Sequence, residues 1–219
     1  MPANYDLLIF DWDGTLSDSI GRIVEAMKMA ALRSDQPVRS DEAVKGIIGL
    51  GLPEAIRELY PQLDDEQVAV VRQHYADCYM ALDCEPSQLF EGVVQALEGF
   101  KAAGYMLAVA TGKARRGLDR VLKAHGWEHY FHITRGADEA RSKPDPLMLE
   151  QILQHCGVTA GRALMVGDSA FDLQMALNAG MDSVAVGYGA LSLEALRQYR
   201  PVLAVERFAD LAAWLQSAE

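Results

Sequence analysis

The sequence has 219 residues, of which 50% are hydrophobic and 23% are charged. This is enough for one sizeable core with a smaller appended module, and it argues against long disordered segments. A net charge of −11 makes the chain a poor candidate for nucleic-acid binding. Three cysteines without framework spacing are typical of reduced thiols, and no export signal or membrane span is recognisable, so we expect a cytoplasmic protein.

Short apolar runs predict the strands of a parallel sheet. They are residues 5–10, 106–111, 163–168 and 182–187, with weaker candidates at 131–134 and 202–205. Between them lie helical patterns that end near Gly104, Gly126 and Gly180. Buried strands that alternate with helices are typical of an α/β fold whose parallel sheet is covered on both faces.

Residues 17–86 interrupt this alternation, since they carry no strand pattern. Two amphipathic helical faces occur there, at 20–31 and 68–82. We therefore expect an all-helical cap domain (17–86) inserted into a Rossmann-like core formed by residues 1–16 and 87–219. Ligands of open parallel sheets bind beyond the carboxyl ends of the strands. A cap inserted after the first strand would cover that edge.

Three carboxylates are expected at this edge of the sheet. Asp11 and Asp13 follow the first predicted strand, and residues two apart in an extended segment point to the same side. Asp168 ends a third strand. Carboxylates held together repel one another, and a divalent cation is the usual relief. Because hard oxygen ligands select Mg²⁺, the sequence predicts a magnesium site.

Groups that suit a phosphate are expected beside the carboxylates. Lys143 precedes a predicted helix and supplies a fixed positive charge, while Thr111 ends the second long strand and offers a hydroxyl. Backbone N–H groups at the start of the next helix can bind an anion. Asp172 should approach the same edge, although Ser169 and Asp172 also match a helix capping box, and both roles are compatible. The combination predicts a site for a phosphoryl group.

The segments DWDGT, VATGK, Lys143 and VGDSAFD, in this order, resemble the four motifs of the haloacid dehalogenase (HAD) superfamily of phosphohydrolases. The insert after the first strand is similar to that of members with a helical C1 cap. The chain looks most like the phosphoglycolate phosphatase and β-phosphoglucomutase group, and the resemblance covers essentially all of it.

The resemblance implies roles for the carboxylates. Asp11 would attack phosphorus and form an aspartyl-phosphate, and Asp13 would protonate the leaving oxygen and later deprotonate the attacking water. Asp11, the main-chain carbonyl of Asp13, and Asp168 would hold Mg²⁺. The metal should keep Asp11 ionised, while Asp13 is better placed to hold a proton.

The remaining motif residues would bind the phosphoryl group. Thr111, Gly112 and Lys143 would contact its oxygens together with Asp11, and Asp172 would orient Lys143 or a metal-bound water. Many phosphoglycolate phosphatase relatives carry asparagine where this chain has Gly112. The missing side-chain amide leaves the identity of the substrate open.

The predicted cap offers weaker candidates. Lys45 and Arg57 flank its glycine-rich loop and could select the substrate by binding a carboxylate or a second phosphate, although they also fit as solvated charges. Ser17, Asp18 or Ser19 is expected to cap the first cap helix.

The implied function is Mg²⁺-dependent hydrolysis of a small phosphorylated metabolite, either phosphoglycolate-like or a sugar phosphate. We expect a monomer or weak homodimer with no nucleic-acid or membrane partner. One alternative is a phosphomutase of the β-phosphoglucomutase type, which uses the same aspartyl-phosphate. Another is a low-turnover, phosphate-dependent binding or regulatory protein. Asp13 argues against a true dehalogenase, which needs no leaving-group acid there.

Overall fold

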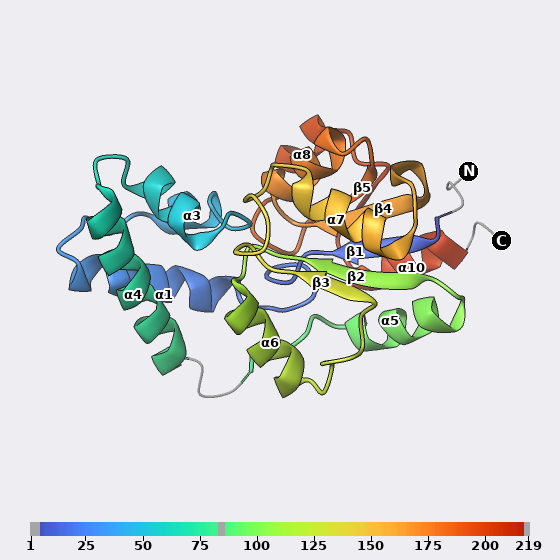
Figure 1. Cartoon of the computed structure of the whole chain (residues 1–219), viewed down its shortest axis with the longest axis horizontal. Helices are drawn as coiled ribbons and strands as arrows, with labels where there is room; N and C mark the ends of the chain where they lie inside the picture. Colours follow the sequence, from blue (N-terminus) through green and yellow to red (C-terminus); the bar gives the residue numbers. More distant parts are fainter. Residues whose placement is uncertain (1–4, 83–85, 217–219) are drawn as a thin grey trace.

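A six-stranded parallel sheet forms the centre of the protein (Figure 1), in a computed structural model that describes residues 5–82 and 86–216. The strand order is β3-β2-β1-β4-β5-β6. The strands are β1 (Leu7–Phe10), β2 (Met106–Ala110), β3 (Ile133–Arg135), β4 (Ala163–Gly167), β5 (Asp182–Val186) and β6 (Leu203–Val205). All six predicted strands are present, and the predicted α/β class is confirmed.

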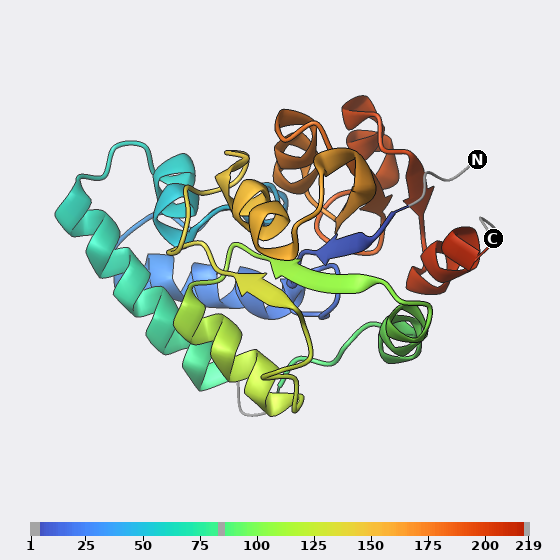
Figure 2. The same ribbon diagram turned by 45° about the vertical axis from the view of Figure 1, so that its right-hand side comes forward.

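Helices cover both faces of the sheet (Figures 1 and 2). One layer contains α5 (Val93–Ala102), α6 (Arg115–Ala124) and α10 (Phe208–Gln216), and the other contains α7 (Leu147–Cys156) and α8 (Ala170–Asn178), while the short α9 (Leu193–Leu196) packs beside α8. Leu8 and Phe10 of β1 pack into the first layer and Leu7 and Ile9 into the second, because successive strand residues point to opposite faces. Among the described residues, no helix is long and apolar enough to cross a membrane.

The first four helices after β1 precede the core helix α5 and form a separate apolar cluster at one end of the molecule (Figure 1). They are α1 (Ile20–Arg33), α2 (Asp41–Lys45), α3 (Leu52–Leu59) and α4 (Asp65–Leu82). The predicted helical insert is thus confirmed, and we call these four helices with their connections the cap. The domain limits at 17 and 86 stay a prediction, and residues 83–85 beside the second limit lie outside the described residues.

The strand order brings the predicted polar residues together. β1 lies between β2 and β4, and its last residue, Phe10, is in register with Val109 of β2 and Val166 of β4. The residues that follow these three strands therefore emerge side by side at one edge of the sheet. The cap lies at this edge (Figure 1), as expected for an insert that leaves the core directly after β1.

Candidate active site

The first residues beyond β1, β2 and β4 are polar and buried. They are Asp11, Thr111 and Asp168, each no more than 1% exposed. The Asp11 N–H donates to the carbonyl of Val166 at 3.0 Å, which fixes Asp11 against the neighbouring strand. The Thr111 hydroxyl oxygen accepts from the N–H of Lys113 at 3.2 Å. The rigid sheet therefore holds two carboxylates and a hydroxyl at one edge.

Asp11, Asp168 and Asp172 form a compact group of buried carboxylates. One oxygen from each lies within 4.8 Å of the others, an arrangement that could hold a metal ion. Burial raises the pKa of Asp11 to about 7, and Asp172 adds to this effect while Lys143 opposes it. Burial, followed by the charges of Asp11 and Asp172, also raises the pKa of Asp168 well above its ordinary value. The group therefore requires positive charge to stay ionised.

Lys143 supplies part of that charge. It precedes α7, is 2% exposed, and donates from Nζ to Asp11 Oδ1 at 2.8 Å and to Asp172 Oδ1 at 2.6 Å. Burial alone would lower the pKa of Lys143, but the charges of Asp11 and Asp172 outweigh it and raise this pKa above its ordinary value. One ammonium faces three carboxylates, so two negative charges remain uncompensated when all are ionised.

Asp168 is held by groups from two loops. Its Oδ1 accepts from the Thr15 hydroxyl at 2.8 Å, and its Oδ2 accepts from the Ala190 N–H at 2.7 Å. Gly14 has a φ of +82°, and a Cβ on it would lie 2.1 Å from Asp168 Oδ2. Glycine is therefore required at position 14 of the DWDGT segment for two reasons: the backbone has a positive φ, and a side chain would collide with Asp168.

Asp172 has two roles that the sequence leaves open. Its Oδ2 accepts from the backbone N–H and the hydroxyl of Ser169, and the Ser169 hydroxyl oxygen accepts from the Asp172 N–H, which completes a capping box at the start of α8. Its Oδ1 accepts from Lys143. The helix terminus therefore fixes the carboxylate that orients the lysine.

Asp13 faces the cap instead of the carboxylate group. Its Oδ1 accepts from the Ser19 hydroxyl at 2.5 Å and lies 2.9 Å from Lys113 Nζ. Lys113 also donates to the Tyr79 hydroxyl of α4 at 3.4 Å. The two motif aspartates thus have separate partners, one lysine each.

The prediction that Ser17, Asp18 or Ser19 caps the first cap helix is confirmed in position, because Ser19 is the N-cap residue of α1, but the expected side-chain hydrogen bond is absent. The Ser19 backbone is helical, and its hydroxyl donates to Asp13. An ionised carboxylate accepts a stronger hydrogen bond than a neutral group does. The Ser19 hydroxyl therefore links Asp13 to the start of α1.

A loop of the cap, residues 46–51, packs directly on the core. The N–H of Gly51 donates to the Ser142 hydroxyl at 2.8 Å. A Cβ on Gly112 would lie 2.6 Å from the carbonyl oxygen of Leu50 and 2.8 Å from that of Gly49. Glycine at position 112 therefore leaves the space that this loop occupies, which gives a physical reason for the absence of asparagine.

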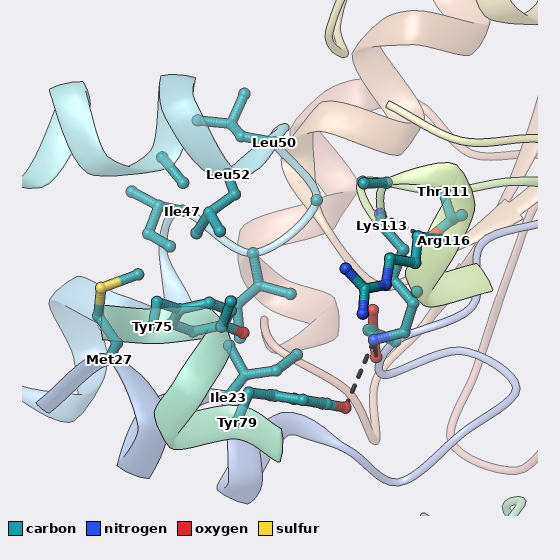
Figure 3. Close-up of a pocket in the computed structure, with 18 of the residues that line it drawn as sticks. Ile23, Met27, Ile47, Leu50, Leu52, Tyr75, Tyr79, Thr111, Lys113 and Arg116 are labelled. Carbon is teal, nitrogen blue, oxygen red and sulfur yellow. Dashed lines mark hydrogen bonds and ion pairs between the residues drawn. The ribbon is translucent and has the colours of Figure 1, made fainter. Parts of the chain in front are cut away.

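A cavity of about 480 Å³ lies between the cap and this edge of the sheet (Figure 3). Asp11, Asp13 and Thr111 border it from the core. Lys45 and Arg57 are not among its lining residues, and Arg57 is exposed and paired with Asp65 at 2.8 Å. Their predicted role in substrate selection gains no support from this arrangement and stays a prediction.

Sequence reasoning does not single out several residues that complete the site. Lys113 is the last residue of the VATGK segment, and its pairing with Asp13 depends on the position of α4. Thr15 belongs to DWDGT, so its position in the motif was an available signal. Ser142 and Tyr79 have no local signal, because their contacts join segments far apart in the sequence.

Comparison with known proteins agrees with this geometry. Residues 8–186 match the model of a family described as "Haloacid dehalogenase-like hydrolase". The chain belongs to this family. It is 36% identical over 209 residues to "Probable phosphatase IndB" of Dickeya dadantii, and the aligned region covers 94% of this chain and 91% of the relative. It is 33% identical over 191 residues to the phosphoglycolate phosphatase of Vibrio cholerae, with 84% of each covered.

Solved structures show the same fold. A "predicted phosphoglycolate phosphatase" from Haemophilus somnus has 27% identity and a TM-score of 0.82, with all of both chains covered. A hydrolase from Pseudomonas syringae has 23% identity and a TM-score of 0.89, with 99% of both chains covered. The family match and the curated relatives confirm the resemblance to HAD hydrolases of the phosphoglycolate phosphatase type and the expected enzyme class, while the solved structures confirm the fold.

Replacing Lys143 with methionine is expected to lower the free energy of unfolding by about 3–5 kcal/mol at about pH 8, because it leaves Asp11 and Asp172 buried without their cation. The loss should be smaller at about pH 5.5, where a protonated Asp11 no longer needs compensation. Urea unfolding measures the loss of unfolding free energy at each pH. Lys28→Met, which removes the cation of the surface pair with Asp41, is the control and should behave like the wild type. Equal losses in the two variants would contradict the account.

Gly112→Ala is expected to displace the cap loop, because the new methyl group overlaps two backbone carbonyl oxygens. Overpacking of this kind costs about 1–3 kcal/mol. Hydrogen exchange at the Gly51 amide, which is bonded to Ser142, should become faster. Gly99→Ala in α5 is the matched control, since a Cβ there meets nothing within 4 Å. Unchanged exchange in Gly112→Ala would show that the loop does not depend on this glycine.

Proposed function

We propose that the protein is a Mg²⁺-dependent phosphatase that hydrolyses small phosphorylated metabolites through an aspartyl-phosphate on Asp11. The observation that carries this proposal is the position of Asp11. It belongs to the buried carboxylate group and also borders the cavity, together with Asp13. A phosphate ester in the cavity would therefore meet a nucleophile and a proton carrier on the same side. Relatives named as phosphoglycolate phosphatases support the reaction class.

The donor set fits a magnesium ion. The group consists of oxygen donors from three buried carboxylates, and Lys143 compensates one of their charges. Hard, oxygen-only ligands with excess negative charge favour Mg²⁺ over softer metals. Asp11 and Asp168 would hold the ion, with the main-chain carbonyl of Asp13 as a further ligand and Asp172 beside them. When bound, the ion would supply charge stabilisation for the transferring phosphoryl group.

The residues of this chain then divide the reaction between them. Asp11 forms a bond to phosphorus as the bond from phosphorus to the leaving oxygen breaks, and Asp13 gives that oxygen a proton. Asp13 next takes a proton from the water that attacks phosphorus, and phosphate leaves as Asp11 is regenerated. Lys143 and the Thr111 hydroxyl hold the phosphoryl oxygens in place.

Release of inorganic phosphate from p-nitrophenyl phosphate, with and without Mg²⁺, tests the activity. Asp11→Asn is expected to reduce kcat/KM by at least about 10³-fold, because an amide is not a nucleophile. Asp18→Asn makes the same chemical change at an exposed position of the same segment and should retain activity. Full activity in Asp11→Asn, or no dependence on Mg²⁺, would rule out the proposed reaction.

The metal site should also show in stability measurements. The pKa of Asp11 is raised from 3.8 to about 7. The protonated Asp11 side chain therefore adds to the free energy of unfolding of the metal-free protein at low pH, and this stabilisation is lost as the pH rises from about 4 through about 7. Mg²⁺ needs the ionised carboxylate, so its stabilising effect should grow over this range. Free Mg²⁺ at a hundred times its Kd should raise the free energy of unfolding by about 2.7 kcal/mol.

Thermal unfolding measures this effect at about pH 5.5 and pH 8. The increase in Tm on adding Mg²⁺ should be larger at the higher pH, and Asp168→Asn should reduce it. An increase that is equal at both pH values, or that survives in Asp168→Asn, would place the ion elsewhere.

A further inference from the structure

We propose that the leaving group of the substrate carries an apolar body of several carbon atoms, which binds in the cavity against the cap while the phosphoryl group binds at the sheet edge. This inference rests on the proposed phosphatase function and narrows its substrate class. It predicts a phosphate monoester of an apolar alcohol in preference to phosphoglycolate or another doubly anionic metabolite.

The cap side of the cavity is predominantly apolar. Figure 3 shows Ile23, Met27, Ile47 and Leu52 on this side, facing the core residues across the cavity. They come from α1, α3 and the loop before α3. Tyr75 and Tyr79 of α4 add two rings whose centroids lie 5.9 Å apart. A ligand that extends away from the sheet edge therefore meets hydrocarbon and aromatic surface.

The positive charges lie on the opposite side. Lys113, Arg116 and Arg120 border the cavity, and all three belong to the segment that follows Thr111 (Figure 3 shows the first two). Among the described cap residues that line the cavity, none is lysine, arginine or histidine, while Asp77 is acidic. Positive charge thus lies on the core side of the cavity, where Lys113 pairs with Asp13 and Arg120 lies 5.8 Å from the ring centroid of Tyr79. A carboxylate carried beyond Tyr79, toward α1 and α3, would meet no cation among the described residues that line the cavity there.

Tyr79 marks the change between the two sides. Lys113 Nζ lies 3.4 Å from its hydroxyl and 5.0 Å from its ring centroid, so the tyrosine holds the lysine that pairs with Asp13. Its ring stands beside Tyr75 on the cap side. The hydroxyl of Tyr79 therefore lies at the polar edge of the cavity and its ring at the apolar surface. A leaving group that extends from Asp13 toward the cap would contact both parts of this side chain.

The size of the cavity favours a larger leaving group. Its volume of about 480 Å³ falls within the range typical of sites for drug-sized ligands. A two-carbon acid would leave most of the apolar lining in contact with water. Each buried methylene should instead raise kcat/KM by up to about fourfold, from the usual transfer free energy of a CH₂ group.

A series of alkyl phosphates tests the proposal with the wild-type protein and Mg²⁺. Ethyl, butyl and hexyl phosphate have leaving groups of similar intrinsic reactivity, so differences in kcat/KM report contacts with the leaving group. We expect a rise of at least about tenfold from ethyl to hexyl phosphate, and a lower value for phosphoglycolate than for hexyl phosphate. A flat series, or phosphoglycolate equal to or above hexyl phosphate, would overturn the inference while phosphate release still depends on Mg²⁺ and Asp11. No Mg²⁺-dependent release from any ester would instead overturn the proposed function, and the inference with it.

Leu52→Lys adds the cation that the cap side lacks. It should lower the ratio of kcat/KM for hexyl phosphate to that for phosphoglycolate by at least about tenfold. Because both values come from the same preparation, the ratio does not depend on the folded fraction. Leu32→Lys is the control, since Leu32 is 66% exposed on α1 and does not line the cavity. An unchanged ratio in Leu52→Lys, or an equal change in Leu32→Lys, would contradict the assignment of the apolar surface to the leaving group.

Discussion

A buried lysine between two buried aspartates is the interaction on which the rest of the site depends. Lys143 contacts both Asp11 and Asp172, and each of the three is at most 2% exposed. Removing a charge from water is costly unless a partner compensates it. The sheet positions Asp11, and the capping box positions Asp172. The lysine therefore has a fixed orientation before any ligand arrives, which is what a group that stabilises a transferring phosphoryl charge requires.

The cap is connected to this charge system through few but direct contacts. Ser19, at the start of α1, donates to Asp13, and Tyr79 of α4 contacts the lysine that pairs with Asp13. Gly51 is bonded to Ser142, only one residue before Lys143. The same cap elements that enclose the cavity therefore touch Asp13 and its neighbours, which border the cavity from the core. Movement of the cap would alter the surroundings of Asp13 while Asp11 stays fixed by β1 and β4.

The sequence allows the core and the motif residues to be predicted because their signals are local. Buried parallel strands are continuous apolar runs, and residues such as Asp11 and Asp168 follow them directly. Contacts across the cap are different, since Lys113 meets Tyr79 only after α4 has packed on α1. No spacing along the chain indicates that pair. The lining of the cavity, and hence the expectation for Lys45 and Arg57, likewise depends on helix packing that the pattern alone does not determine.

The central claim is that Asp11 is the nucleophile of a site whose charge is balanced by Lys143 and a divalent cation. The most direct test is mass spectrometry of protein quenched in acid during turnover of a phosphate ester with Mg²⁺. The account predicts one added phosphoryl group on the peptide that contains Asp11, absent in Asp11→Asn and in samples without Mg²⁺. Turnover with no modified peptide at any quench time, or with the phosphoryl group on a different residue, would contradict it.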